Sequence, residues 1–161
     1  MATYDGRKIK GQVYIDIQGM DAIAAAIEDF ADEVLKPALY DTIAASQLDR
    51  IRKRFLAETD PNEKPWPKSK AALDRAASGR DGGTLFDTGK LFHSISVAIP
   101  SKNKRRIKTN IPYAIYHQEG TKKLPQRAFL GFSASDIQRI EKFVDAAVLK
   151  WAAKHNEGVK V

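Results

Sequence analysis

The chain has 161 residues, of which 43% are hydrophobic and 29% charged, and its formal net charge is +7. This length predicts one domain over residues 1–161, with enough buried surface for a hydrophobic core. The lack of cysteine excludes disulfides and thiolate metal sites. No segment approaches the roughly 20 apolar residues that span a bilayer, so we expect no membrane partner.

The positive charge is concentrated in the middle of the chain. Residues 61–132 contain 14 basic and 5 acidic side chains, whereas residues 1–60 contain 8 basic and 11 acidic ones. A concentrated patch of one sign favours docking to acidic protein or to DNA. The same pattern is typical of a lysine-rich surface in contact with water, and both interpretations stay open at this point.

The first third of the chain predicts one strand followed by long helices. Apolar residues alternate with polar ones from Lys10 to Gln18, which predicts a half-buried strand. From about residue 21 to 58 they recur at helical spacing, and Pro37 removes one hydrogen bond within that stretch. We therefore expect a long helix, or two helices in line, with a break near Leu35–Lys36.

The section from residue 59 to 83 is rich in proline and glycine, which predicts a mobile loop. One short helix is expected within it, from Ser69 to Ala77. After this loop, Thr84 and Asp87 fit a capping pattern around a short turn, which Gly89 would limit.

The next elements predict a hairpin with a basic tip. A strand from about His93 to Ile99 is followed by a turn and by an antiparallel return from Arg105 to Asn110. A short helix is then expected over Pro112–Glu119, and a final strand or extended segment over Leu124–Phe132.

The last part of the chain predicts a C-terminal helix. Ser135 and Gln138 form a capping box, and an apolar stripe continues to about Lys154; the residues after His155 should fray. The expected fold class is α+β. An antiparallel sheet, built from the N-terminal strand, the basic-tipped hairpin and the late strand, would pack against the long N-terminal helix and the C-terminal helix.

The tip of the hairpin is the best candidate for a nucleic-acid contact. Each of its basic residues could neutralise one phosphate, which would give affinity without sequence preference. No aromatic residues alternate with them for base stacking, and a charged tip exposed to water is an equally consistent interpretation. The residues are Lys102, Lys104, Arg105, Arg106 and Lys108.

No motif of an enzyme is present in the sequence. The three histidines lie far apart, and none has a histidine or acidic residue at ligand spacing. A metal-assisted hydrolase would have to assemble His93 and His117 with a carboxylate such as Asp87 or Glu119. We expect no catalysis, no cofactor and no metal site.

Several short motifs follow one another along the chain. They are Arg54-Phe55, Pro65-Trp66-Pro67, Leu85-Phe86-Asp87-Thr88-Gly89-Lys90-Leu91, Tyr113-Ala114-Ile115-Tyr116-His117 and Leu124-Pro125-Gln126-Arg127-Ala128-Phe129-Leu130-Gly131. Taken in this order, the motifs resemble the Mu-like phage virion-morphogenesis family, also called tail-completion proteins. The resemblance covers roughly residues 20–152. One departure is Ala128, where a proline would often precede Phe-Leu-Gly.

The resemblance implies a small structural subunit that needs neither catalysis nor a cofactor. Such a subunit would assemble in the host cytoplasm into a ring at the neck or tail end of a tailed phage or prophage-derived particle. Its partners would be copies of itself, as a hexamer or larger ring, together with neck or connector and tail-tube proteins. Passing contact with phage DNA is also implied. The neck layer and the number of subunits stay open.

The motif residues are expected to maintain the fold and the geometry of the ring. Subunits would contact their neighbours through the N-terminal arm, the 59–83 loop, the hairpin tip and the C-terminal tail. The residues that we assign to the fold and to assembly are Trp66, Asp87, Gly89, Leu91, Tyr113, His117, Arg127 and Phe129.

Overall fold

The computed structural model describes residues 4–9, 12–17 and 20–156. Two pairs of short strands are each followed by a run of helices, and the predicted α+β class is confirmed. In chain order the elements are β1 (Tyr4–Ile9), β2 (Gln12–Ile17), α1 (Met20–Val34), α2 (Pro37–Ala57), α3 (Lys70–Ala77), α4 (Lys90–Ser94), β3 (Ser96–Ser101), β4 (Lys104–Lys108), α5 (Ala114–Glu119) and α6 (Ala134–Asn156).

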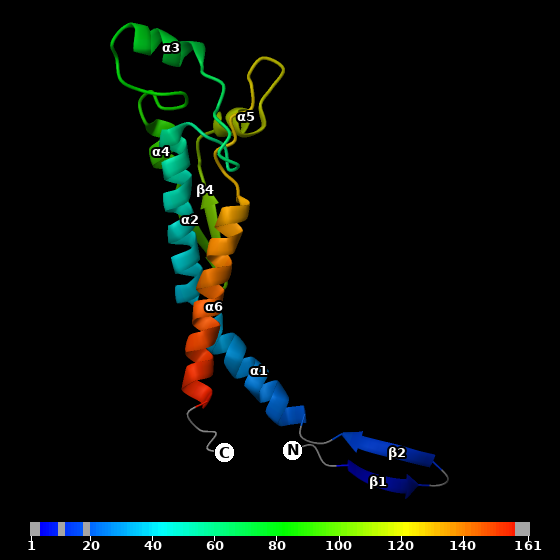
Figure 1. Cartoon of the computed structure of the whole chain (residues 1–161). Helices are drawn as coiled ribbons and strands as arrows, with labels where there is room; N and C mark the ends of the chain where they lie inside the picture. The colour runs from blue at the N-terminus through cyan, green and yellow to red at the C-terminus, as the bar shows by residue number, and fades with distance from the viewer. Residues whose placement is uncertain (1–3, 10–11, 18–19, 157–161) are drawn as a thin grey trace.

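The two long helices α2 and α6 run side by side and form the shaft of an elongated molecule (Figure 1). At one end lie α3, α4, α5 and their loops, which we call the head (residues 58–95 and 111–133). At the other end α1 turns away from the shaft and packs on the last part of α6; we call this end the foot. The β3–β4 hairpin packs on α2.

The predicted break between the first two helices is confirmed. Lys36 is the N-cap of α2, with φ −62° and ψ 151°, and Pro37 is its first residue. Proline is favoured there because its missing N–H would have no partner inside the helix. The residue before a proline avoids helical geometry. The last turn of α1 therefore ends with the hydrogen bond from Leu35 N to the carbonyl of Ala31.

The strands form two separate antiparallel pairs, β1 with β2 and β3 with β4. The predicted strand from Lys10 to Gln18 appears as β2, and three residues of that range, Lys10, Gly11 and Gln18, lie outside the described residues. Its partner is β1, in the segment expected to be an arm, so the N-terminal strand does not join the basic-tipped hairpin in one sheet.

The sequence predicted a strand or an extended segment over Leu124–Phe132; no strand forms there, and the segment has no regular secondary structure. Its backbone groups bond to side chains and to α5 in place of a neighbouring strand. The Gln118 side-chain oxygen accepts from the N–H groups of Phe129 and Leu130, and its amide donates to the carbonyl of Leu130. One glutamine side chain therefore satisfies three backbone groups that a neighbouring strand would otherwise satisfy.

The short elements of the head differ in detail from their predictions. The helix expected from Ser69 is α3, and the Ser69 hydroxyl caps it by accepting from Ala72 N at 3.1 Å. His93 lies in α4 rather than at the start of a strand, because a helical turn follows Gly89 before β3 begins. The expected helix over 112–119 begins two residues later, as α5, and ends at Gly120.

The C-terminal helix begins with a different capping box from the predicted one. The Ser133 hydroxyl accepts from Asp136 N at 3.1 Å, and the Asp136 carboxylate accepts from Ser133 N at 2.8 Å. This reciprocal pair satisfies two N–H groups that a helix start leaves without partners. The predicted box of Ser135 and Gln138 was therefore wrong by two residues. The tail expected to fray includes residues 157–161, which lie outside the described residues.

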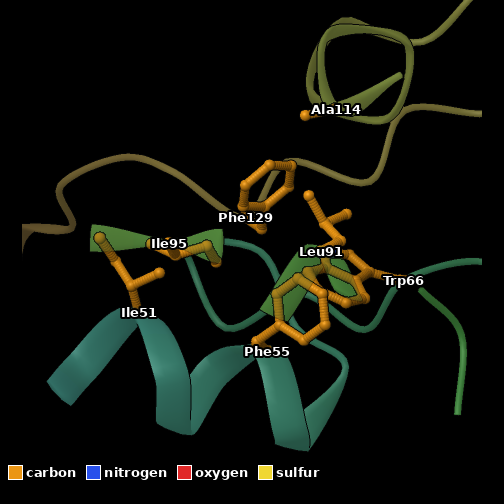
Figure 2. Close-up of a cluster of buried hydrophobic side chains, with 7 residues drawn as sticks. All are labelled: Ile51, Phe55, Trp66, Leu91, Ile95, Ala114 and Phe129. Atoms are coloured by element: carbon orange, nitrogen blue, oxygen red, sulfur yellow. The ribbon is translucent and has the colours of Figure 1, made fainter. Parts of the chain in front are cut away.

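The hydrophobic core lies where the head meets the end of α2 (Figure 2). The Phe55 ring packs edge to face on Trp66 and Phe129, with centroid distances of 5.4 and 5.8 Å. Such aromatic pairs each contribute about 0.5–1.5 kcal/mol beyond the area that they bury. The core residues are Ile51, Phe55, Trp66, Leu91, Ile95, Ala114 and Phe129.

Candidate functional site

A pocket in the head, with a cavity volume of about 550 Å³, brings together side chains from α3, α5 and the loops around them. Five of the eight residues assigned from the sequence to fold and assembly line it: Asp87, Leu91, Tyr113, His117 and Arg127. The other polar residues along its wall are mostly cations, namely Lys68, Lys70, Arg75 and Lys123. We call this cavity the head pocket.

Arg127 fixes the wall of the head pocket. It is 4% exposed, and its Nε donates to the carbonyl of Pro67 at 2.7 Å. Its backbone N–H donates to the carbonyl of His117, also at 2.7 Å. Burial lowers the pKa of Arg127. Arg127 therefore joins two segments, the 59–83 loop through its side chain and α5 through its backbone N–H, while its charge stays on the pocket wall.

His117 lines the same cavity, and its imidazole is partly buried. Burial, and then the neighbouring charge of Arg127, lowers the pKa of His117 below its usual value. Its Nδ1 atom is buried and has no hydrogen-bond partner among the described residues. The ring of Tyr113 packs edge to face on it, with a centroid distance of 6.0 Å. The burial of His117 and the nearby positive charge of Arg127 both favour a neutral imidazole at neutral pH.

The other assigned residues divide into core and surface. Trp66, Leu91 and Phe129 are buried in the core, and Trp66 Nε1 donates to the carbonyl of Ala128 at 3.0 Å. Asp87 is exposed, and its carboxylate lies 3.5 Å from the Arg75 guanidinium. It makes no capping bond with Thr84, whose N–H donates to Glu58 instead.

Gly89 has a specific backbone role at the start of α4. Its φ is +72°, in the left-handed region, where a side chain adds strain. A Cβ atom there would lie 2.9 Å from the His93 ring. The residue therefore sets the direction in which α4 leaves the preceding turn.

The sequence interpretation missed a buried charged cluster at the junction of shaft and head. Asp136 is 1% exposed, and its carboxylate accepts from Arg54 and from Arg50, the latter at 3.1 Å. Gln47 and Arg54 also donate to the carbonyl of Gly131. Gln47, Arg50 and Arg54 lie about one helical turn apart on one face of α2. This row of polar residues was the signal in the sequence that could have indicated the cluster.

The pKa of Asp136 reflects this cluster. Burial alone would raise it, but hydrogen bonds from the Ser133 backbone and from Arg54 and Arg50 outweigh burial. The pKa of Asp136 therefore lies well below its usual value. A charged carboxylate at the start of α6 also interacts favourably with the helix dipole.

The basic hairpin presents one exposed row of cations. Lys104, Arg106 and Lys108 are exposed at alternate positions of β4, whereas Arg105 and Ile107 between them are half-buried. The Arg105 side chain is 8% exposed and pairs with Asp41 of α2. Arg105 therefore holds the hairpin to the shaft, and the remaining candidates for a DNA contact are Lys102, Lys104, Arg106 and Lys108.

The metal site considered from the sequence is not assembled in the described part of the chain. No group of three or more His, Cys, Asp or Glu residues there could hold a metal ion. None of the described helices has both the length and the apolar character needed to cross a membrane.

Comparison with models of protein families identifies the family of the chain. Residues 18–149 match the model of the phage virion morphogenesis family. This match includes α1–α5 and most of α6, and therefore both the head pocket and the Asp136 cluster. Comparisons with curated proteins and with solved structures gave no match.

Proposed function

Because the chain belongs to the phage virion morphogenesis family, we propose that it is a structural subunit of a ring at the neck or tail end of a tailed-phage or prophage-derived particle. In this proposal it is a Mu-like tail-completion protein, needed for tail completion and head–tail joining. Its partners are copies of itself, in a hexamer or larger ring, and the neighbouring connector and tail-tube proteins. The proposal assigns it no catalysis and no cofactor.

The observation that carries this proposal is the position of the β1–β2 hairpin. The two strands pair with each other from Tyr4↔Ile17 to Ile9↔Gln12. In the described parts of the chain they pack on no other helix or strand beyond isolated contacts, and Figure 1 shows them away from the shaft.

An isolated two-stranded hairpin is at best marginally stable in water. Its outer edges also carry backbone N–H and C=O groups that can pair with a strand of another chain. These features are those of an arm that pairs with a neighbouring subunit. Assembly through such an arm is heterologous, because the arm of one copy meets a different surface of the next, and such contacts close into rings.

The buried residues of the head support the same role. Three side chains form hydrogen bonds with backbone carbonyl or N–H groups of other segments, namely those of Trp66, Gln118 and Arg127. These contacts fix how the loops of the head sit on the shaft. A ring requires each subunit to hold the same shape, and a rigid head supplies it.

The test compares the wild-type chain with a variant that lacks residues 4–17. Mass photometry and negative-stain microscopy should show rings of one size for the wild type and monomers for the deletion. Circular dichroism on the deletion should show that the helices remain. A wild-type chain that stays monomeric, alone and with tail tubes, would overturn the proposed function. A deletion that still forms rings would show that the arm is not what joins the subunits.

A small basic DNA-binding module is the second candidate. The observation that favours it is the exposed row of Lys104, Arg106 and Lys108, whose side chains stand about 7 Å apart along one face of β4. The triple change of these residues to Glu should abolish salt-dependent binding to duplex DNA. Arg105 is left unchanged, since it holds the hairpin to α2. A wild-type chain that gives no salt-dependent shift would reject this function.

A further inference from the structure

The head pocket has more positive charge than its own chain neutralises. Among the described residues, Lys68 pairs with Glu58 at 2.6 Å, and Arg75 lies 3.5 Å from Asp87. No ion pair between described residues uses the other three cations of the wall, which are Lys70, Lys123 and Arg127.

Two buried polar atoms of the pocket residues are also without partners. Arg75 is 8% exposed, and its Nε has no acceptor among the described residues; the same holds for His117 Nδ1. Both atoms are enclosed by the chain, so a ligand in the pocket would meet the exposed cations Lys70 and Lys123 of the wall and not these two nitrogens. The pocket also contains apolar walls at Leu85, Leu124 and Pro125. The cations without ion pairs and the apolar walls together suit a carboxylate carried by an apolar segment.

The foot of the molecule carries the complementary charge. Helix α1 contains five acidic residues and no Lys or Arg. Two of them face α6, where Asp29 lies 3.0 Å from His155 and Glu33 pairs with Lys154. Glu28 and Asp32 are exposed, and no ion pair between described residues uses either of them.

Glu28 and Asp32 are four residues apart and so lie on one face of α1. A like-charge pair at this spacing destabilises the helix that carries it, unless a cation outside the helix offsets the repulsion. Ile27 and Leu35 flank the two acids and are 61% and 41% exposed. We call these four residues the acidic stripe. Asp32 also borders a surface hollow with Lys36 and Lys102, without forming an ion pair there in the described structure.

The head pocket and the acidic stripe cannot meet within one molecule. Helices α3 and α5, which line the pocket, and helix α1, which carries the stripe, lie at opposite ends of the shaft (Figure 1). The 21 residues of α2 alone separate them by about 31 Å. We propose that the head pocket of one copy receives the acidic stripe of the next copy, with Glu28 and Asp32 opposite Lys70, Lys123 and Arg127.

This inference rests on the proposed ring function and names the faces that meet in it. The contact is heterologous, since the head of one subunit meets the foot of another, as a closed ring requires. Ile27 and Leu35 of the stripe would cover the apolar walls of the pocket. The acids of the stripe and the cations of the pocket would pair around this apolar contact. This arrangement, apolar at the centre and polar at the rim, is that of a specific protein interface.

Two charge-reversal variants test the inference. The head variant is Lys70→Glu with Lys123→Glu, and the foot variant is Glu28→Lys with Asp32→Lys. Each should weaken self-association roughly 100-fold, because like charges then face each other across the interface. Arg127 is left unchanged, since it also holds the loops of the head. The readout is the distribution of oligomers by mass photometry over a range of protein concentrations.

Matched controls carry the same change of charge elsewhere. Lys142→Glu with Lys150→Glu matches the head variant, and both residues are exposed on α6. Glu141→Lys with Asp145→Lys matches the foot variant, with the same four-residue spacing on an exposed helix face. Both controls should assemble like the wild type. Circular dichroism should show equal helix content in all four variants.

The decisive experiment mixes the two variants. The acidic stripe of the head variant meets the unchanged pocket of the foot variant, and the introduced lysines of the foot variant meet the introduced glutamates of the head variant. Opposite charges then face each other at both interfaces, so the mixture should regain the self-association that each variant alone has lost. A mixture that stays monomeric, or a single variant that still forms rings, would overturn the inference. Wild-type rings in that case would leave the proposed function standing. Loss of binding to duplex DNA by the head variant, with its self-association unchanged, would identify the ligand as phosphate and also overturn the inference.

Discussion

The carboxylate of Asp136, at the start of α6, pairs with the guanidinium of Arg54, near the end of α2. This buried pair joins the two helices of the shaft at the point where the head begins. It also supports the backbone between them, because Arg54 donates to the carbonyl of Gly131. The orientation of the head on the shaft therefore depends on one charged contact between residues 82 positions apart.

Replacing Asp136 by Asn should lower the free energy of unfolding by about 3 kcal/mol. The substitution leaves Arg54 buried without its anion and removes the anionic acceptor from Arg50. Urea unfolding followed by circular dichroism measures the change. The control is Asp145→Asn, an exposed residue on the same helix, which should change stability by less than about 0.5 kcal/mol. Equal effects of the two substitutions would contradict the importance of the pair.

The contribution of Asp136 should depend on pH. Its pKa is lowered in the folded chain, so it stabilises the fold above its usual pKa. The stabilisation is lost as pH falls from that usual value toward the folded one. The difference in stability between wild type and Asp136→Asn should therefore shrink between about pH 4 and about pH 2. A difference that stays constant over this range would show that the charge of Asp136 is not what stabilises the junction.

Gln118→Leu should destabilise the head by about 2–3 kcal/mol. Leucine has a similar size but leaves the N–H groups of Phe129 and Leu130 without an acceptor. Gln126→Leu is the matched control. That side chain is exposed and makes a single bond, from its amide to the Gln118 carbonyl, so the change should cost about 0.5 kcal/mol or less. Thermal unfolding measures the stability of both variants. Similar losses of stability would show that the hydrogen bonds of Gln118 to the backbone of Phe129 and Leu130 do not stabilise the head.

Gly120→Ala should cost more than Gly79→Ala. At Gly120 the backbone has φ +77° and ψ 174°, a region open essentially to glycine alone. A Cβ there would also lie 2.9 Å from the backbone nitrogen of Gln126. We expect a loss of about 2–3 kcal/mol.

At Gly79, with φ +65°, a Cβ would meet nothing within 4 Å, so only the backbone strain of about 1 kcal/mol applies. Chemical denaturation of the two variants gives the comparison. If they lose the same stability, the close approach of residues 120 and 126 does not shape the loop beside the head pocket.

The sequence by itself determined the elements whose signals are local. Pro37 ended one helix and began the next, because its ring and its missing N–H act on adjacent residues. Ser69 capped α3 in the same way. The alternation around the hairpin tip predicted β3 and β4 within a few residues. The ordered motifs between Arg54 and Gly131 also indicated the family that the match over residues 18–149 shows.

Only the tertiary structure decided how distant segments satisfy each other. The side chain of Gln118 took the place of a strand partner for Phe129 and Leu130, and Asp136 pairs with Arg54 across 82 positions of the chain. The tertiary structure also places the helices that line the basic head pocket and the helix that carries the acidic stripe at opposite ends of α2. No count of charges along the sequence reveals this separation. The physical reason is that hydrogen bonds and ion pairs act over a few ångströms in space. Sequence separation carries no information about that distance once it exceeds a turn or a hairpin.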